Sequence, residues 1–579
     1  MARIEYHKNH KLSTKWIFGG LAAAVILIVS SILLILYPFA SKDIKTYFQG
    51  KNPILFDGHQ AGNALLEGNT LFVPVSFLQK NIDKGIVYDA KSHSIIITTA
   101  DKVVQMPTDS LTYYVNQKPV NLHITPFKSE NGEMYVALDP ILSYYPIQYN
   151  KLAQSGAIWI QKNGEKLLEG HLTPNKINLE KLRLRTKPSW QSPYTAEMKP
   201  GELVLIEGEK AEFYLVRKMN GISGYIKKEY VQKEETKTIK ISHVSKQAPI
   251  KKINGPIQLT WENVYNQNPD TSQIQKMAGV NVVSPTWFTL AGNDGSISNL
   301  ASLDYSKWAK SKGYQVWGLF SNAFNPELTH AALKDYQTRQ KIIRQLLLFS
   351  KMYQLQGINF DIENVKSEDG PLVTQFLREA TPYLHQAGLV VSMDITFSFG
   401  QGNNWSSFYQ RNELSKITDY LIVMAYDEHW GPDSGSGSIA SLPWVETNLQ
   451  KLLTEVPKER LILGVPLYTR LWKEQVNKAG SLEISAKALT MDKVKEWLKE
   501  KKLKPTYDSK SGQNYAEYYD KKEKATYKIW IEDNLSLTKR KNLAETYQLA
   551  GIATWSRFFG DQAAWVSLDL NSDKAVTKK

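Results

Sequence analysis

The sequence contains no cysteine among its 579 residues. This absence excludes disulfide bonds, cysteine-ligated zinc, iron–sulfur clusters and a thiol nucleophile. A lack of disulfides is typical of a reducing compartment, but the N-terminal features described below point the other way, so cysteine content does not fix the compartment. Apolar residues make up 42% and charged residues 22% of the chain, which excludes wholesale disorder. A chain of this length predicts about three to five domains.

Acidic residues are too few to balance the basic ones, with 57 Asp and Glu against 71 Lys and Arg. Residues 1–254 carry 33 basic and 22 acidic residues, whereas residues 255–579 carry 38 and 35. Such an excess of positive charge favours a polyanionic partner, which could be nucleic acid, a membrane surface or an acidic cell wall. Because no recognisable nucleic-acid motif accompanies the charge, we expect no nucleic-acid partner.

One long run without charge stands near the N-terminus. Residues 17–37 are 21 residues that lack Asp, Glu, Lys and Arg, and this length predicts one transmembrane helix. Basic residues predominate in the preceding tail, residues 1–16, which predicts a cytoplasmic N-terminus and places the rest of the chain outside the cell membrane. The alternative is a cleaved signal peptide, although its apolar region would normally be only about 7–15 residues long.

Residues 50–165 predict short apolar strands separated by turn residues, and they contain a weak internal repeat. The segment TLFVPVSFL (70–78) is followed by two strand-like runs, and MYVALDPIL (134–142) repeats that order. This α+β repeat module resembles the copper amine oxidase N-terminal-like domain. The resemblance implies no copper, and His59, His93 and His123 are too scattered to bind it.

Residues 176–233 resemble a bacterial SH3-like domain. They predict five short strands of a small β-barrel, with a hairpin turn at Asn220-Gly221. The resemblance implies binding to a polyanionic cell wall, and an inert spacer is the equal alternative. The polar residues 234–254 predict a linker.

Residues 255–570 alternate apolar strand-like runs with amphipathic helical stretches. Eight such runs, from IQLTW (257–261) to GIATWS (551–556), predict a (β/α)₈ TIM barrel with its active site at the C-terminal strand ends. Residues 471–549, between strands seven and eight, exceed an ordinary connection and predict a small α+β insertion lobe.

Polar residues gather at three of these strand ends. Asn359, Asp361 and Glu363 alternate along strand four, so their side chains point to one face. Strand six ends in Met424, Tyr426 and Asp427, and strand eight ends in Trp555. A ladder of polar groups in a barrel interior is costly unless the groups bond one another or serve a site.

These motifs resemble glycoside hydrolase family 18. QGINFDIE (356–363) is similar to the family signature DGxDxDxE, MAYD (424–427) matches its M-x-Y-D strand, and Trp555 matches its last-strand tryptophan. Further segments resemble the subgroup of spore-forming bacteria that degrades spore-cortex peptidoglycan. Gln356 and Asn359 depart from the signature, because each stands where it has Asp.

The resemblance implies a retaining reaction in which the substrate's own N-acetyl group is the nucleophile. Glu363 would be the general acid and base, and Asp361 would hold the acetamido N–H. Asn359 would orient Asp361, and Tyr426 would donate to the acetamido oxygen. Trp555 would form the apolar floor beneath the sugar.

Further residues are candidates for substrate binding that packing explains equally well. They are Met424, Asp427, Trp287, Trp261, Tyr468, Arg470 and Glu532. His429 has no second ligand at a suitable spacing, so we expect no metal and no cofactor.

The leading hypothesis is a membrane-anchored glycosidase that cleaves β-1,4-linked N-acetylglucosamine glycans, with peptidoglycan favoured over chitin. Two alternatives remain open at this stage. One is a barrel that binds glycan without turnover, and the other is a structural protein of the envelope.

Overall fold

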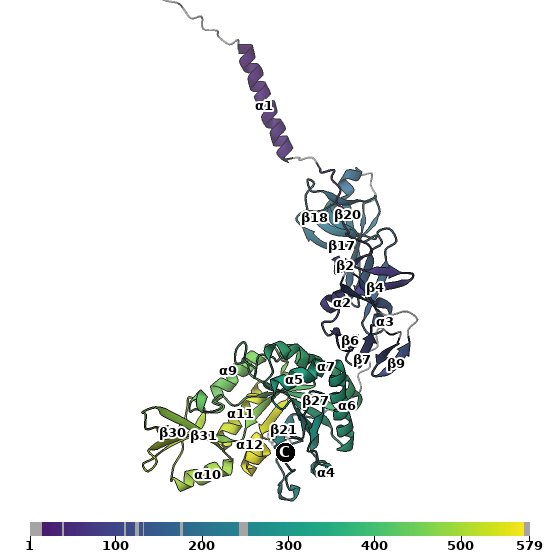
Figure 1. The fold of residues 1–579 in the computed structure, drawn as a ribbon. Coiled ribbons are helices and arrows are strands. Elements are labelled where there is room, and N and C mark those ends of the chain that lie inside the picture. The colour runs from purple at the N-terminus through teal and green to yellow at the C-terminus, as the bar shows by residue number, and fades with distance from the viewer. Residues whose placement is uncertain are drawn as a thin grey trace, which may run out of the picture. The chain divides into compact units, whose positions relative to one another are not determined.

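A computed structural model describes residues 14–36, 40–108, 110, 112–121, 127–130, 132–173, 178–242 and 253–571. The chain forms two compact units (Figure 1). Unit 1 comprises Met1–Lys84 and Pro126–Val244, and unit 2 comprises Gly85–Thr125 and Ser245–Lys579.

The predicted membrane-spanning segment corresponds to helix α1 (Thr14–Leu36). A bilayer core requires about 20 consecutive, predominantly apolar helical residues. Within the part of the chain that the structure describes, no helix is both long enough and apolar enough to cross a membrane. This finding contradicts the predicted single-pass topology, including the cytoplasmic N-terminus and the wall-facing catalytic region. The basic tail before Thr14 lies outside the described residues.

Unit 1 contains the predicted repeat. The first copy begins with β4 (Thr70–Pro74) and α2 (Val75–Asn81), and the second with β11 (Glu133–Ala137) and α3 (Leu138–Leu142). Strands β4 and β11 pair antiparallel, and each is followed directly by its helix. The sheet around them has the order β10-β11-β4-β3, where β10 is Phe127–Glu130 and β3 is Leu65–Glu67. A second sheet has the order β12-β13-β1-β2, from Ile147–Lys151, Ile158–Lys162, Pro53–Phe56 and His59–Asn63.

A seven-stranded sheet completes unit 1, in the order β16-β15-β19-β18-β17-β14-β20. Its strands are β14 (Lys166–Leu172), β15 (Arg183–Arg185), β16 (Tyr194–Glu197), β17 (Leu203–Lys210), β18 (Phe213–Lys218), β19 (Ser223–Lys227) and β20 (Val231–Thr238). Strand β20 pairs with β14 as far as Thr238, so the first residues of the predicted linker are in a strand. Residues 232–238 of this edge strand are exposed and mostly charged, which disfavours pairing with another chain.

Unit 2 is built on a closed barrel of eight parallel strands. They are β21 (Ile257–Glu262), β22 (Val282–Pro285), β25 (Gln315–Ser321), β26 (Gly357–Asp361), β27 (Val390–Thr396), β28 (Tyr420–Met424), β29 (Leu461–Pro466) and β35 (Gly551–Trp555). Each strand pairs parallel with the next, and a β22–β25 pairing closes the ring. Nearly every residue of these strands is buried, as expected for parallel strands covered on both faces.

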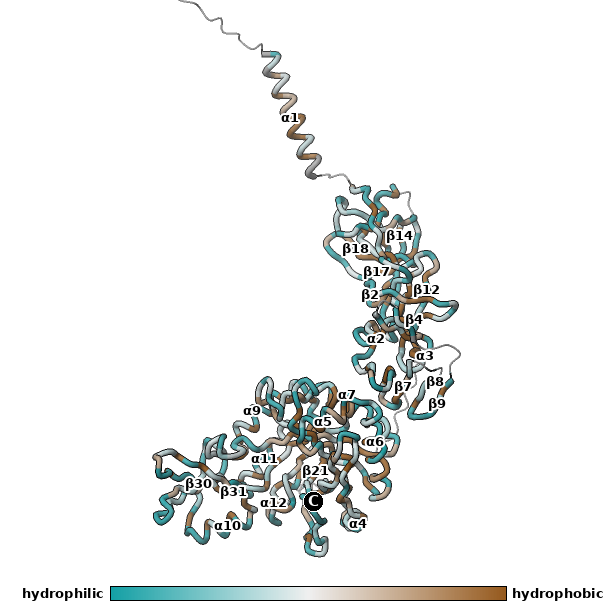
Figure 2. Tube along the Cα trace, viewed as in Figure 1, coloured by the Kyte–Doolittle hydropathy of each residue, from teal (hydrophilic) through white to brown (hydrophobic). Residues whose placement is uncertain are grey.

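Helices cover the outside of the barrel (Figure 1). They include α4 (Leu303–Ser311), α5 (Pro326–Leu333), α6 (Tyr336–Met352), α7 (Gly370–Gln386), α8 (Arg411–Ile417), α9 (Leu442–Leu452), α11 (Asn534–Thr546) and α12 (Gln562–Leu568). One apolar cluster fills the space between strands and helices, and a smaller one fills the barrel interior around Trp261 and Trp317. Figure 2 shows hydrophobic residues around β21 and hydrophilic residues on the outer turns.

The predicted insertion is a lobe of five antiparallel strands and one helix. Its strands have the order β31-β30-β34-β33-β32, from Leu482–Leu489, Thr469–Val476, Ala525–Ile531, Gln513–Asp520 and Thr506–Asp508. The helix α10 (Met491–Glu500) packs its apolar side against this sheet.

A further sheet in unit 2 comes from the N-terminal half of the chain. Its strands, in order, are β5 (Val87–Asp89), β6 (Ser94–Thr98), β7 (Val103–Pro107), β8 (Thr112–Val115) and β9 (Lys118–Asn121). Ile96 and Val103 belong to the same apolar cluster as the barrel's outer layer. The sheet is therefore packed against the barrel and is part of that unit.

Candidate active site

The alternation predicted at the end of β26 places three polar side chains on the inner face of the barrel. Asn359 is fully buried, Asp361 is 6% exposed, and Glu363 follows two residues after the strand ends. Strand β26 lies between β25 and β27, so the ladder is enclosed on both sides. The sequence pattern therefore places an amide and two carboxyls together at the end of β26, with Asn359 and Asp361 buried and Glu363 half-buried.

Asp361 and Glu363 share a side-chain hydrogen bond. Burial raises the pKa of Asp361 to about 7, although the bond with Glu363 lowers it. Burial, together with the charges of Asp361 and Asp427, raises the pKa of Glu363 well above its usual value. A carboxyl that stays protonated near neutral pH is suited to act as a general acid.

A third buried carboxyl, Asp394 on β27, belongs to the same cluster and was missed by the sequence analysis. The Asn359 Nδ2 donates to Asp394 Oδ2 at 2.7 Å, and the Ser392 hydroxyl donates to Asn359 Oδ1 at 2.6 Å. Burial and the charge of Asp361 raise the pKa of Asp394 well above its usual value. The available signal was the alternation of Ser392, Asp394 and Thr396, which repeats the polar ladder of β26 on the neighbouring strand.

Asn322, the residue after β25, fixes the backbone of Glu363 and was also missed. Its Oδ1 accepts from the Glu363 N–H at 3.0 Å, and its Nδ2 donates to the Glu363 carbonyl at 2.7 Å. The Nδ2 also donates to the Thr329 hydroxyl at 2.8 Å, which holds the amide itself. Both backbone groups of Glu363 are thereby tied to a neighbouring strand.

Tyr426 and Asp427 continue from the end of β28. The Tyr426 hydroxyl is buried and, within the described residues, has no hydrogen-bond partner. Asp427 Oδ1 accepts from the Tyr468 hydroxyl, and from Arg470 Nη2 at 3.1 Å. Asp427 has φ of 62°, which turns the chain sharply after the strand. Met424 is half-buried at the end of β28 and packs against the apolar cluster.

Two tryptophans lie at the centre of the barrel mouth. The Trp261 and Trp555 rings are 5.7 Å apart between centroids and tilted by 60°. Trp261 is 1% exposed, whereas Trp555 remains half-buried. Trp555 can therefore offer its ring to a ligand, while the buried Trp261 packs against it.

Two predicted substrate-binding residues lie in packed environments. Trp287 is 1% exposed, and its indole N–H donates to Asn268 Oδ1 at 2.6 Å. Glu532 is 1% exposed and accepts from Arg540 Nη2 at 2.6 Å and from Gln513 Nε2 at 2.8 Å. The surroundings of both side chains are those of structural residues.

Gln356 lies at the N-terminal end of β26, opposite to the catalytic end. Its Oε1 accepts from the Val316 N–H at 2.9 Å. Gln356 departs from the family signature at a structural position, where its side chain helps to hold the start of β26 against β25.

Exposed aromatic side chains rise from the loops that follow the strands. Phe324 and Trp405 are 40% and 45% exposed with centroids 6.4 Å apart, and Trp430 is 56% exposed. Flat apolar faces of this kind are suited to contact sugar rings.

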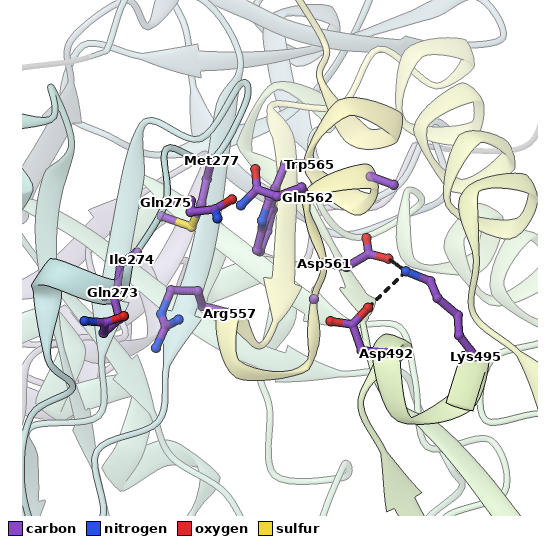
Figure 3. A pocket seen from close by; sticks show the side chains of 12 residues that line it. Gln273, Ile274, Gln275, Met277, Asp492, Lys495, Arg557, Asp561, Gln562 and Trp565 are labelled. Carbon is purple, nitrogen blue, oxygen red and sulfur yellow. Dashed lines mark hydrogen bonds and ion pairs between the residues drawn. The ribbon is translucent and has the colours of Figure 1, made fainter. Parts of the chain in front are cut away.

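A pocket of about 560 Å³ lies apart from these residues, against α10 and α12 (Figure 3). Lys495 forms ion pairs with Asp492 at 3.0 Å and Asp561 at 2.5 Å, and Arg557 Nη2 donates to Glu262 at 2.9 Å. The charged residues that line this pocket are thus paired with one another. The acid cluster at the strand ends therefore remains the candidate active site.

Comparison with known families gives two matches. Residues 265–560 match the family described as Glycosyl hydrolases family 18. Residues 56–157 match the Copper amine oxidase N-terminal domain. Both matches confirm resemblances found in the sequence, whereas the SH3-like resemblance stays a prediction.

Among known relatives, the uncharacterized glycosylase YvbX of Bacillus subtilis (strain 168) is 25% identical over 299 residues, 50% of this chain and 84% of that protein. The Cortical fragment-lytic enzyme of the same strain is 24% identical over 256 residues, 44% of this chain and 58% of that enzyme. The chain thus matches little more than half the length of that second relative. The crystal structure of the Bacillus megaterium QM B1551 spore cortex-lytic enzyme SleL gives a TM-score of 0.49 and 20% identity over 58% of this chain and 77% of that chain.

Proposed function

The chain belongs to glycosyl hydrolase family 18 and is a glycosidase, and from that premise we propose that it cleaves β-1,4-linked, N-acetylglucosamine-containing glycan with net retention. The observation that carries this proposal is the neighbouring pair of buried Asp361 and half-buried Glu363, together with a buried Tyr426 hydroxyl that has no hydrogen-bond partner among the described residues. An acid, a neighbouring carboxylate and a hydroxyl donor are the groups that substrate-assisted hydrolysis requires.

In the first step, Glu363 donates its proton to the glycosidic oxygen while the C1–O bond breaks. The carbonyl oxygen of the substrate's acetamido group attacks C1 from the opposite face and forms a cyclic oxazolinium ion. Asp361 holds the acetamido N–H and stabilises the positive charge. The Tyr426 hydroxyl, buried and without a partner within the described residues, donates to the acetamido oxygen.

In the second step, the Glu363 carboxylate takes a proton from water as the water attacks C1. The ring of the oxazolinium ion opens, the acetamido group is restored, and Glu363 regains its proton. Two inversions at C1 give net retention. Trp555 supplies the apolar floor for the sugar, and Asp427, Tyr468 and Arg470 form the polar wall beside it.

We favour peptidoglycan over chitin as the substrate. The name of the Cortical fragment-lytic enzyme supports a cell-wall glycan, although only 58% of that enzyme is matched. The excess of basic residues within 1–254 supports contact with an acidic polymer, and we assign this contact to the predicted modules 50–165 and 176–233.

The anomeric configuration of the first product tests the mechanism. Purified protein is incubated with peptidoglycan fragments and with chitin oligomers, and proton NMR follows the first product before mutarotation. Retention is expected, together with inhibition by a thiazoline mimic of the cyclic intermediate. An inverted product, or equal cleavage of a de-N-acetylated sugar, would contradict the proposed mechanism.

A further inference from the structure

Glu363, the general acid of the proposed reaction, lies beyond the end of its strand. The last pair between β25 and β26 joins Ser321 to Asp361. The last pair between β26 and β27 joins Phe360 to Met393. Past these pairs, the backbone groups of Glu363 need hydrogen-bond partners other than a neighbouring strand. A side chain that must deliver a proton to one particular oxygen atom therefore depends on another means of support.

The Asn322 amide supplies this support from the end of β25. Its Oδ1 accepts from the Glu363 N–H at 3.0 Å, and its Nδ2 donates to the Glu363 carbonyl at 2.7 Å. A side-chain amide carries a donor and an acceptor, as a peptide group does. Asn322 therefore pairs with Glu363 much as one further residue of a neighbouring strand would, and a side chain continues the ladder of β25 and β26.

The backbone after Asn322 does not continue that ladder, because the chain turns there. Ala323 has φ of 56° and Phe324 has φ of 51°, which are left-handed conformations that residues other than glycine rarely adopt. The turn is held by Asn322 Oδ1, which also accepts from the Phe324 N–H at 3.3 Å, and by Asn364 Nδ2, which donates to the Phe324 carbonyl at 2.9 Å. Strained backbone of this kind persists where surrounding contacts determine it, and it is concentrated at functional sites.

The Asn322 amide is itself held in one orientation. Asn322 is 2% exposed and Thr329, on α5, is 1% exposed. Asn322 Nδ2 donates to the Thr329 hydroxyl at 2.8 Å, and this hydroxyl donates to the Asn325 carbonyl at 2.7 Å. A buried amide whose two halves are both bonded forms part of a rigid network. The support of Glu363 is thereby anchored to a helix as well as to a strand.

We propose that Asn322 is a positioning residue that holds the Glu363 carboxyl in place to protonate the glycosidic oxygen. It acts through the backbone of Glu363 and does not touch the substrate. This inference rests on the proposed function, because that function assigns Glu363 as the general acid. A proton donor must lie within about 2.6–3.2 Å of the atom that it protonates, and a misplacement of about 1 Å can lower a rate about 10²-fold. Loss of the amide therefore slows proton donation and leaves sugar binding in place.

The leaving group of the substrate separates proton donation from other contributions to the rate. A sugar leaving group departs as an alcohol and needs the proton of Glu363, whereas a nitrophenolate leaving group departs without one. The test therefore compares an N-acetylglucosamine oligomer with the nitrophenyl glycoside of the same sugar. The value of kcat/KM is measured for both, because it covers the steps up to and including cleavage of the bond.

In Asn322→Ala, kcat/KM for the oligomer is expected to fall about 10–100-fold. For the nitrophenyl glycoside, the expected fall is less than about threefold. KM for the oligomer should change less than about twofold, since the lost interaction is one that matters in the transition state.

Thr329→Val tests the same support without altering Asn322. Valine keeps the shape of threonine and removes the hydroxyl that accepts from Asn322 Nδ2. The expected fall in kcat/KM for the oligomer is smaller, about 2–10-fold, because the amide keeps both bonds to Glu363. The nitrophenyl glycoside should again be the less affected substrate.

Asn299→Ala is the matched control. The Asn299 amide is also bonded through both halves, since its Oδ1 accepts from the Ala301 N–H at 2.9 Å and its Nδ2 donates to the Tyr353 hydroxyl at 3.2 Å. These partners lie outside the acid cluster. The substitution is expected to leave the ratio of the two kcat/KM values unchanged, even where it lowers thermal stability.

An equal fall for the two substrates in Asn322→Ala, or an unchanged value for the oligomer, would overturn the proposal. Hydrogen exchange of residues 361–365 gives a readout that needs no turnover. The Glu363 N–H is expected to exchange faster in Asn322→Ala than in the wild type and in Asn299→Ala. Unchanged exchange in Asn322→Ala would also overturn the proposal, whereas a wild type that hydrolyses neither substrate would count against the proposed function alone.

Discussion

At the scale of single residues, the proposed active site is built around acids whose environment favours their protonated form. Glu363 is tied to Asn322 through its backbone and to Asp361 through its side chain. Its position is therefore fixed on both sides, and substitution of the side chain tests chemistry with little effect on placement.

Glu363→Gln is expected to lower kcat by on the order of 10²–10⁴, the usual contribution of one general acid or base. Binding of an N-acetylglucosamine oligomer should persist, because the amide keeps the size of the carboxyl. Steady-state kinetics and calorimetric titration measure the two effects. Glu368→Gln, an exposed acid in the same loop, is the control and should retain wild-type turnover. Near-wild-type turnover in Glu363→Gln would show that Glu363 is not the general acid and base.

Asp361→Asn is expected to make the protein more stable at alkaline pH while abolishing most activity. Burial raises the pKa of Asp361 to about 7, so the folded state binds more protons than the unfolded state between about pH 4 and pH 7. Stability of the wild type therefore falls as pH rises through this window.

Asp361→Asn does not lose stability in this window. Its unfolding free energy should therefore exceed that of the wild type by on the order of 1–3 kcal/mol at pH 8, with no difference at pH 4. Thermal melts at both pH values measure the difference. The control is Asp433→Asn, at an exposed position, whose effect on stability should be small and equal at the two pH values. A gain that is equal at pH 4 and pH 8 would show that ionisation of Asp361 is not its cause.

The sequence predicted some residues of this site and missed others, and the reasons are physical. Asn359, Asp361 and Glu363 were found because a polar ladder at the end of an apolar strand is costly without a purpose. Asp394 was missed because it lies inside VVSMDITF, where flanking apolar residues hide the same alternation. Burial of Trp287 depends on Tyr305 and Tyr353, which are distant in sequence, so no local pattern could separate packing from sugar stacking.

At the scale of elements, the eight strands were predictable because each is an apolar run bounded by turns. The segment VNVVSPTWF (280–288) is the exception, since its sequence predicts one strand but the chain there divides into β22 and β23 (Phe288–Leu290). Pro285 ends β22, because proline lacks the N–H needed to continue a ladder. The insertion lobe was predicted from the sequence, whereas its attachment to the barrel was not.

One contact where the lobe meets α11 is the buried ion pair of Glu532 and Arg540, whose side chains are 0% and 2% exposed. Glu532→Ala is expected to cost on the order of 3–5 kcal/mol, because it leaves the Arg540 charge buried without its partner. Chemical denaturation measures this cost.

Glu496→Ala removes the exposed partner of Lys493 on α10 and should leave stability unchanged. If Glu532 instead binds substrate, as the sequence also allowed, Glu532→Gln would raise KM with little change in stability.

At the scale of the whole molecule, the boundary of the catalytic unit differs from the boundary of the family match. The match to the Copper amine oxidase N-terminal domain covers 56–157, yet residues 85–125 form a compact unit with the barrel. The sequence could not reveal this, because the contacts join segments more than 200 residues apart.

Asp89 on β5 carries much of this contact. Its Oδ2 accepts from the Tyr336 N–H at 2.8 Å, at the first turn of α6, and its Oδ1 accepts from Ser92. A negative charge at a helix N-terminus is favourable, since it meets unpaired N–H groups and the positive end of the helix dipole. Lys91 adds an ion pair with Asp335, the residue that caps the same helix, at 2.8 Å.

Asp89→Ala in the full chain is therefore expected to lower the stability of the barrel by about 1–3 kcal/mol, the cost of a lost charge-assisted hydrogen bond that leaves its donor unpaired. Hydrogen exchange should show faster opening of the first turn of α6, 336–340, and thermal melts should show an earlier transition. Asp57→Ala is the control, because the Asp57 side chain forms an exposed pair with Lys162, and it should leave that turn unchanged. Equal protection of α6 in the two variants would mean that the Asp89 contact does not stabilise the barrel. Faster exchange confined to Asp89→Ala would show that a segment from the N-terminal half stabilises the catalytic unit.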